Sequence, residues 1–282
     1  MHLSLFFLVL LHLLFLFFML EAPTQAQGKS LVSAIFIFGD STADPGNNNY
    51  ITTPFKSNFS PYGRDFANHV PTGRFTNGML ASDFFARYVG VKEYVPPYLD
   101  PSLSIEELKS GVSFASAGTG FDPLTPTISE LLDQGARKIG VVGLPPMGCL
   151  PVVITLHSDN AFTKRDCADF FSSIARDYNS KLQNQLNAMQ IRFAKLGSRI
   201  AYMDIYGPLI DMILGRKYDF EKSNSGCCGT GLLEASFMCN PKSYICPNAS
   251  KYVFWDSIHP TENTYYLISQ ALQPTIDSIT KN

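Results

Sequence analysis

The chain has 282 residues, of which 45% are hydrophobic and 16% are charged, and its formal net charge is −2. This length allows one α/β domain or two smaller domains. Because nucleic-acid binding depends on clustered Lys and Arg, the near-neutral charge and the lack of a basic stripe argue against a nucleic-acid partner.

An apolar segment covers residues 3–20, and the small residues Thr24 and Ala26 follow it. This order is typical of a secretory signal. The alternative is a membrane anchor, since about 18 apolar residues can just span a bilayer. No basic stop-transfer cluster follows the segment, which favours cleavage. We therefore predict a signal peptide over residues 1–27 and a secreted, extracellular domain over residues 28–282, without stable membrane insertion after cleavage.

The mature part alternates strand-like and helix-like segments. Strands are predicted where short apolar runs end at Gly, Pro or Asp, at 34–38, 111–116, 138–143 and 199–206. Helices are predicted where apolar residues recur every three to four positions, at 77–90, 128–134, 167–197 and 261–279, the last interrupted near Pro274. Continuous apolar strands between helices predict a three-layer α/β/α fold with a mainly parallel sheet.

Ser41 follows the first predicted strand directly, in the sequence Gly39-Asp40-Ser41. In a parallel α/β sheet, ligands bind at the carboxyl ends of the strands, so this serine lies where a nucleophile would be placed. The alternative is that Ser41 is the N-cap of the next helix, an ordinary role for serine. A serine acts as a nucleophile only when a base accepts its proton, so the interpretation depends on a histidine elsewhere in the chain.

His259 is the histidine with a carboxylate at useful spacing, because Asp256 precedes it by three residues. On a turn or a first helical turn, positions i and i+3 share a face. Asp256 is then placed to accept from Nδ1–H of His259 and to leave Nε2 for the serine. We expect Ser41, His259 and Asp256 to form a catalytic triad. Asp204 is a weaker candidate for the acid, and His69 and His157 are expected on the surface.

Six cysteines lie downstream of residue 148, an even number that predicts disulfides in a secreted chain. Six cysteines allow 15 pairings, and the sequence does not choose among them. The adjacent Cys227 and Cys228 are expected to pair elsewhere rather than with each other. A zinc site is the alternative, and the spacing of Cys and His disfavours it. Two N-x-S sequons predict glycosylation at Asn58 and Asn248.

Taken together and in this order, the motifs resemble the plant GDSL-type esterases and lipases of the SGNH hydrolase superfamily. The resemblance covers nearly the whole mature chain. It rests on six blocks: FIFGDSTADPGNNNY, TGRFTNGMLASDFFA, GVSFASAGTGFDPLT, GARKIGVVGLPPMGCLP, CCGTG and YVFWDSIHPTE. The resemblance implies Ser41 as nucleophile, with Asp256 and His259 completing the triad. It also implies that the backbone N–H groups of Ser41 and Gly118 bind the oxyanion, and it implies no metal or organic cofactor.

One block of that family, G-x-N-D, is absent from this sequence, and its asparagine is a third oxyanion donor in the family. The resemblance places the block after the one that ends at Thr125, on a strand of its own. We therefore expect the domain to be shortened near residues 125–128 and to lack one internal strand. The Asn47–Asn49 run is interpreted as turn-forming residues, with positioning of the loop after Ser41 as the alternative. Tyr50, Phe55 and Phe59 are interpreted as core residues, with the lining of an acyl groove as the alternative.

The predicted function is a secreted serine esterase or lipase that hydrolyses carboxylic esters through an acyl-enzyme. Long-chain lipid, acetylated polysaccharide and cutin-like polyester are open as substrates. The absent block supports an alternative, a catalytically impaired or inactive secreted protein that binds lipid or glycan. An acyltransferase with the same triad is a further alternative.

Overall fold

The computed structural model describes residues 32–120 and 128–281. The predicted signal over residues 1–27 and residues 125–127 of the predicted shortening lie outside this part. None of the helices within it combines the length and the hydropathy that a bilayer crossing requires.

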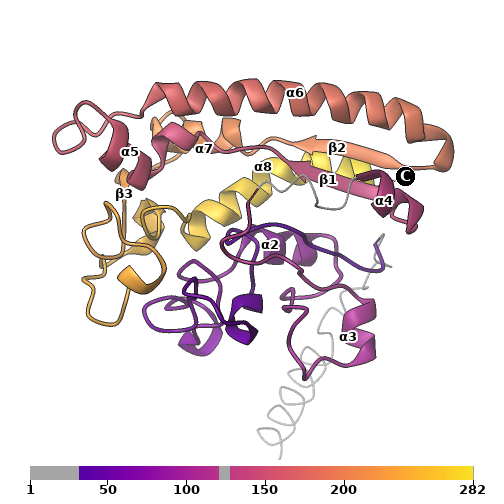
Figure 1. Cartoon of the computed structure of the whole chain (residues 1–282), viewed down its shortest axis with the longest axis horizontal. Coiled ribbons are helices and arrows are strands. Elements are labelled where there is room, and N and C mark those ends of the chain that lie inside the picture. Colours follow the sequence, from indigo (N-terminus) through magenta and orange to yellow (C-terminus); the bar gives the residue numbers. More distant parts are fainter. Residues whose placement is uncertain (1–31, 121–127, 282) are drawn as a thin grey trace, which may run out of the picture. The chain divides into compact units, whose positions relative to one another are not determined.

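The helices and strands of the described part are labelled in Figure 1. The α-helices are α2 (Ala81–Tyr88), α3 (Ile105–Lys109), α4 (Ile128–Asp133), α5 (Pro151–His157), α6 (Asp169–Phe193), α7 (Tyr206–Ile213) and α8 (Glu262–Thr280). The strands are β1 (Lys138–Val142), β2 (Arg199–Met203), β3 (Lys222–Gly226) and β4 (Tyr252–Phe254). Short 3-10 turns occupy Asn47–Tyr50, Ala67–His69, Met147–Cys149, Ala194–Leu196, Ser236–Met238 and Ala249–Lys251.

The centre of the fold is a parallel pair of strands between two long helices. β1 pairs with β2 from Lys138 opposite Arg199 to Val142 opposite Met203. α6 packs on one face of this pair and α8 on the other (Figure 1). Apolar side chains of β1 and β2 are buried against the helices, with Leu186 of α6 on one side. The predicted α/β class, with parallel strands between helical layers, is confirmed.

The strands do not join into one continuous sheet. β1 pairs with β2 and β3 pairs with β4, each in parallel, and no described strand pairs with the other edge of β1. The predicted strand at 34–38 is extended and reaches the segment after Gly111 through a parallel bridge between Ile37 and Ser113. Its Phe36 and Phe38 side chains are 51% and 56% exposed. A strand inside a sheet forms backbone hydrogen bonds with a neighbouring strand on each side. The described segment directly before β1 is the helix α4, so it does not provide such a neighbour for β1.

The C-terminal helix is not interrupted at Pro274, contrary to the prediction. α8 runs continuously from Glu262 to Thr280. Proline removes the hydrogen bond to the carbonyl four residues earlier, here that of Gln270. Gln270 is exposed, so water can solvate that carbonyl. The burial of Leu272 and Ile276 on either side of the proline holds both halves of the helix in the core.

Glu262 at the start of α8 gives the fold a testable pH dependence. Its carboxylate accepts a hydrogen bond from the Met79 backbone N–H at 3.0 Å. Burial raises the pKa of Glu262 above its usual value. The folded chain therefore binds the proton more tightly than the unfolded chain, so the contribution of this group to stability is largest below the unfolded-state pKa and is lost as the pH rises through the folded-state pKa.

Glu262→Gln removes this titration and keeps an oxygen acceptor for Met79. We expect the free energy of unfolding of the variant, relative to the unmodified chain, to rise between pH 4 and pH 7. Denaturant unfolding of both proteins across this range measures the difference. A difference that falls with pH would contradict the assignment.

All six cysteines form disulfides, in the pairs Cys149–Cys167, Cys227–Cys246 and Cys228–Cys239. The adjacent cysteines pair elsewhere, as predicted, and the zinc alternative is wrong because no thiolate is left to bind metal. The last two bridges lie in a buried cluster with Trp255, the residue before Asp256. They therefore anchor the cysteine-rich loop, which runs from Cys227 to Cys246, against the end of β4.

We expect the double variant Cys228→Ala/Cys239→Ala to lower the free energy of unfolding by about 2–4 kcal/mol, the usual contribution of a native disulfide. Denaturant unfolding with the other two bridges intact measures this loss. A loss below about 0.5 kcal/mol would show that the surrounding packing, not the bridge, holds the loop.

Candidate active site

Ser41 lies in a tight turn immediately after the extended segment that contains Ile37. The Ala43 N–H donates to the Asp40 carbonyl at 3.1 Å, and the Asp40 carboxylate accepts from the Thr42 N–H at 2.8 Å. The next helical turn begins at Asn47 with Gly46 as its N-cap. The N-cap interpretation of Ser41 is therefore wrong. The turn leaves Ser41 partly exposed.

Asp256 and His259 lie in the loop between β4 and α8. The Asp256 carboxylate accepts from the backbone N–H groups of Ile258 at 2.8 Å and of His259 at 2.7 Å. These bonds close the loop on the aspartate side chain, which brings positions i and i+3 to one face. Both side chains are buried, Asp256 at 0% and His259 at 3% exposure.

The structure brings the three predicted residues into one hydrogen-bonded line. Nδ1 of His259 lies 2.7 Å from Oδ2 and 2.9 Å from Oδ1 of Asp256. Nε2 of His259 lies 2.8 Å from Oγ of Ser41. Because an ionised carboxylate only accepts, Nδ1 carries the proton and donates to it. Nε2 is then the acceptor for the serine hydroxyl, the arrangement that a general base requires.

The segment that contains Gly118 is bound to the Ser41 turn from two sides. The Gly39 carbonyl accepts from the Ser116 N–H at 3.1 Å, and the Asp44 carboxylate accepts from the Ala117 N–H at 3.0 Å. Within the described residues, neither the Ser41 nor the Gly118 N–H donates to another group. Gly118 has φ +89°, and a Cβ there would lie 2.8 Å from the Phe55 ring. The positive φ and this close contact favour glycine at position 118, and among the described residues both amides lack an acceptor.

The Asn47–Asn49 run does more than form a turn. The Asn47 amide donates to the carbonyls of Ser113 and Ala115 at 2.7 and 2.8 Å. The Asn48 amide donates to the Ala117 carbonyl at 2.9 Å, and the Asn49 amide to that of Thr72 at 2.8 Å. Asn47 and Asn48 are buried and connect the Ser41 segment to the segment before Gly118. The turn-forming interpretation is therefore incomplete, because the side-chain amides add cross-links to the backbone hydrogen bonds that already join residues 35–39 to residues 110–116.

Asp44 completes the same network. It accepts from the N–H groups of Gly46 and Asn47 at 2.8 and 2.6 Å, besides that of Ala117. Burial raises the pKa of the Asp44 carboxyl, and these backbone hydrogen bonds act in the opposite direction. The sequence signal for this arrangement is Asp44 followed, after Gly46, by three consecutive Asn residues. The contacts favour the alternative in which the Asn run positions the loop after Ser41.

Other predicted residues lie away from the hydrogen-bonded line. Asp204 accepts from the N–H of Tyr206 at the start of α7. His69 and His157 are exposed, as predicted. The sequon residues Asn58 and Asn248 are also exposed, which permits glycosylation.

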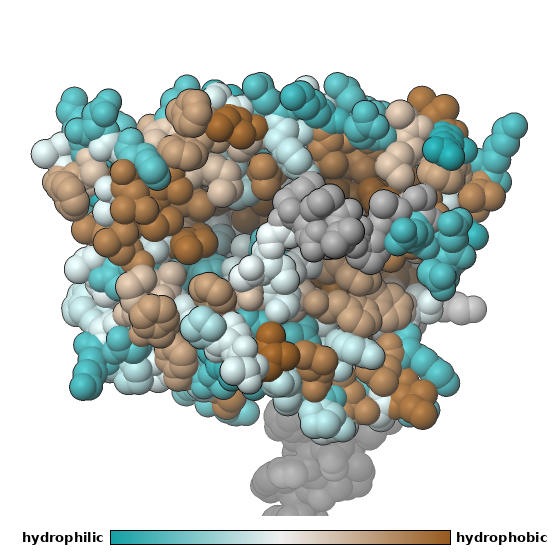
Figure 2. Space-filling model, in the orientation of Figure 1, coloured by the Kyte–Doolittle hydropathy of each residue, from teal (hydrophilic) through white to brown (hydrophobic). Residues whose placement is uncertain are grey.

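Apolar side chains are exposed close to Gly118. Phe55 is 48% and Tyr50 is 46% exposed, so their assignment to the core is wrong, whereas Phe59 packs against a buried cluster. Tyr50 ends the 3-10 turn Asn47–Tyr50, and the Phe55 carbonyl accepts from the Asn48 amide at 2.8 Å. Figure 2 shows a second gathering of hydrophobic residues at its left side, where Figure 1 places α5 and the start of α6. Exposed residues of that region are Leu156, Phe162 and Phe170.

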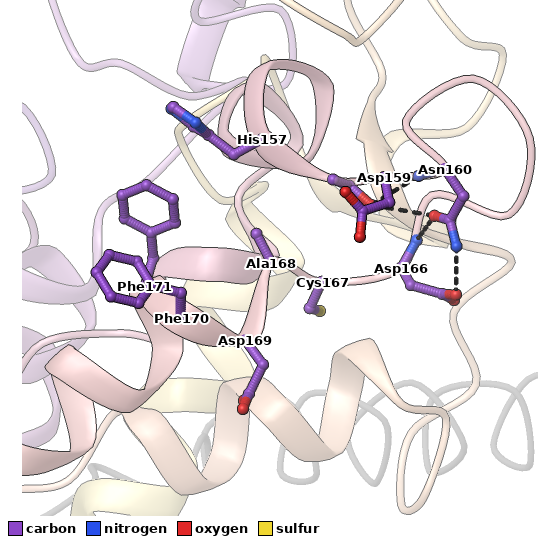
Figure 3. A pocket seen from close by; sticks show the side chains of 10 residues that line it. His157, Asp159, Asn160, Asp166, Cys167, Ala168, Asp169, Phe170 and Phe171 are labelled. Atoms are coloured by element: carbon purple, nitrogen blue, oxygen red, sulfur yellow. Dashed lines mark hydrogen bonds between the residues drawn. The ribbon is translucent and has the colours of Figure 1, made fainter.

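The pocket in Figure 3 is separate from the candidate site. It lies between α5 and the start of α6, beside Cys167, and is lined by residues from His157 to Asn160 and from Asp166 to Phe171. The Asn160 amide closes one side by donating to the Asp166 carboxylate at 2.7 Å. None of the three residues of the hydrogen-bonded line contributes to it.

The model of the GDSL-like lipases and acylhydrolases matches residues 35–135 and 121–272, which together span most of the chain. The chain belongs to this family. Among curated members it is 48% identical to GDSL esterase/lipase At5g45960 of Arabidopsis thaliana, covering 92% of this chain and 90% of the relative. It is 37% identical to GDSL esterase/lipase At1g06990 of the same plant, covering 86% and 89%.

The match to the GDSL-like family is divided inside this chain. The two matched ranges meet and overlap at residues 121–135. The alignment with At5g45960 has 337 positions, and since 92% of 282 residues is about 259, about 78 positions carry no residue of this chain. β1, which has a paired described strand on one edge only, begins shortly after this region.

Proposed function

We propose that this member of the GDSL-like family is a secreted serine esterase that hydrolyses carboxylic esters. The observation that carries the proposal is the line of hydrogen bonds from Ser41 through His259 to Asp256. Family membership supports the reaction class, and the three disulfides support an oxidising, extracellular location. Glycosylation at the exposed Asn58 and Asn248 belongs to the same proposal.

The reaction follows from the donor and acceptor roles in this line. Ser41 Oγ attacks the ester carbonyl carbon while its proton passes to Nε2 of His259. Asp256 holds the imidazolium that forms, and the N–H groups of Ser41 and Gly118 bind the oxyanion. His259 returns the proton to the leaving alkoxide, which gives the alcohol and an acyl-Ser41. Water, deprotonated by the same imidazole, then releases the carboxylic acid and restores the serine.

Two donors at the oxyanion make this a slow esterase. The absence of a G-x-N-D sequence and the divided family match support the loss of an internal segment that carries a third donor. Loss of one such donor costs about 10²–10³ in kcat in a well-studied protease. The alternative function is a lipid- or glycan-binding protein without turnover, which the same loss favours.

Hydrolysis of p-nitrophenyl butyrate by the purified mature chain separates the two functions. The esterase releases p-nitrophenol faster than Ser41→Ala does at equal folded concentration. A folded chain whose rate equals that of Ser41→Ala, and that binds vesicles or acetylated polysaccharide, would support the binding protein. Product analysis in the presence of an alcohol acceptor detects acyl transfer.

A further inference from the structure

Tyr62 makes a hydrogen bond with Asp256 that the triad itself does not account for. The Tyr62 hydroxyl lies 2.7 Å from Oδ2 of Asp256 and accepts from the Ser236 backbone N–H at 2.8 Å. Because that N–H can only donate, the hydroxyl proton of Tyr62 is directed at the carboxylate. Tyr62 is 1% exposed, so no water competes for this bond.

Burial raises the pKa of the Tyr62 hydroxyl well above its usual value, and the adjacent charge of Asp256 raises it further. The hydroxyl therefore stays protonated and remains a donor wherever Asp256 is ionised. The ring is held by edge contacts with Phe59, Phe75 and Trp255. A rigid, protonated donor thus lies against the oxygen that also faces Nδ1 of His259.

The partner of Tyr62 comes from the cysteine-rich loop. Ser236 lies between Cys228 and Cys239, which are bridged, and it has φ +50°, which is uncommon outside glycine. Its Oγ donates to the Lys56 carbonyl at 2.9 Å and so fixes Ser236 to the chain before Tyr62. The loop therefore presents its N–H to the tyrosine in one orientation.

We propose that Tyr62 is a positioning residue that sets the orientation and basicity of the Asp256 carboxylate, with Ser236 fixing its hydroxyl. This inference rests on the proposed function, because it assigns Asp256 to the triad. The hydroxyl withdraws part of the carboxylate charge from His259. Without it, the carboxylate turns more freely and attracts a proton on the imidazole more strongly.

Tyr62→Phe tests the proposal, with Tyr265→Phe as the matched control. Tyr265 is also buried in this region, and its hydroxyl has no hydrogen-bond partner among the described residues. We expect Tyr62→Phe to lower kcat roughly ten- to a hundredfold, the range seen when the hydrogen-bond partner behind a metal-ligating side chain is removed. KM is expected to change little, and the acid limb of the pH–kcat profile moves to higher pH. Tyr265→Phe is expected to leave both unchanged.

A second readout does not require turnover. In the Ser41→Ala background, the midpoint of the His259 imidazole NMR titration is expected at higher pH with Tyr62→Phe. 3-Fluorotyrosine at position 62, a stronger donor of the same shape, is expected to move it to lower pH. If the chain does not hydrolyse the ester, the proposed function is overturned, and the His259 titration still tests the role of Tyr62. Equal midpoints for phenylalanine, tyrosine and fluorotyrosine, in folded proteins, would overturn the positioning role.

Discussion

His259→Ala is expected to lower kcat for p-nitrophenyl butyrate by roughly 10³–10⁴. Loss of the histidine or the serine of a complete triad costs about 2 × 10⁶ in a well-studied protease. By the proposed function the starting rate is already reduced by about 10²–10³, because two backbone donors remain at the oxyanion. If the rate without His259 is a background that the missing donor does not lower further, the expected loss is the quotient of the two factors. Steady-state kinetics at saturating ester measures it.

His157→Ala is the matched control, because this histidine is exposed and lies outside the hydrogen-bonded line. Its kcat is expected within twofold of the unmodified chain. Equal rates for His259→Ala and the unmodified chain, with both proteins folded, would rule out His259 as the base.

Insertion of the internal segment of At5g45960 at the break in the family match is expected to raise kcat by about 10²–10³. The segment would supply a strand for the edge of β1 with which no described strand pairs, and a side-chain donor for the oxyanion. The insertion site lies within residues 121–135, where the two matched ranges overlap. The rate of the chimera is measured beside that of the unmodified chain with the same ester.

The control is the same chimera in which the asparagine of the G-x-N-D block, which the family resemblance places in this segment, is replaced by alanine. This control is expected to recover the folding of the sheet and to lose most of the gain in kcat. A chimera that folds and gains nothing would show that two donors suffice and that the chain was not impaired by the missing donor.

The sequence predicts the parts of the fold in which local pattern and burial agree. The apolar run of β1 and the helical periodicity of α6 are found where they were expected. Pro274 was misleading because helix interruption depends on whether packing on both sides of the proline outweighs one lost hydrogen bond, and Leu272 and Ile276 are buried. The disulfide pairing depends on which loops meet, which spacing alone does not encode.

For the candidate site, the motif order was sufficient to nominate Ser41, Asp256 and His259. The spacing of Asp256 and His259 fits a single turn, and the structure has that turn. Tyr62 and Ser236 carry no comparable signal, because they lie 174 residues apart and meet only through the folded cysteine-rich loop. Asn47 and Asn48 were underestimated because their partners are backbone carbonyls of a distant segment.

Covalent labelling with a fluorophosphonate probe, mapped to the modified residue by peptide mass spectrometry, tests directly whether Ser41 is an activated nucleophile. We predict that the adduct of the mature chain lies on Ser41, that His259→Ala slows its formation, and that Ser41→Ala abolishes it. A folded chain that stays unlabelled at Ser41, or that is labelled equally well without His259, would contradict the account.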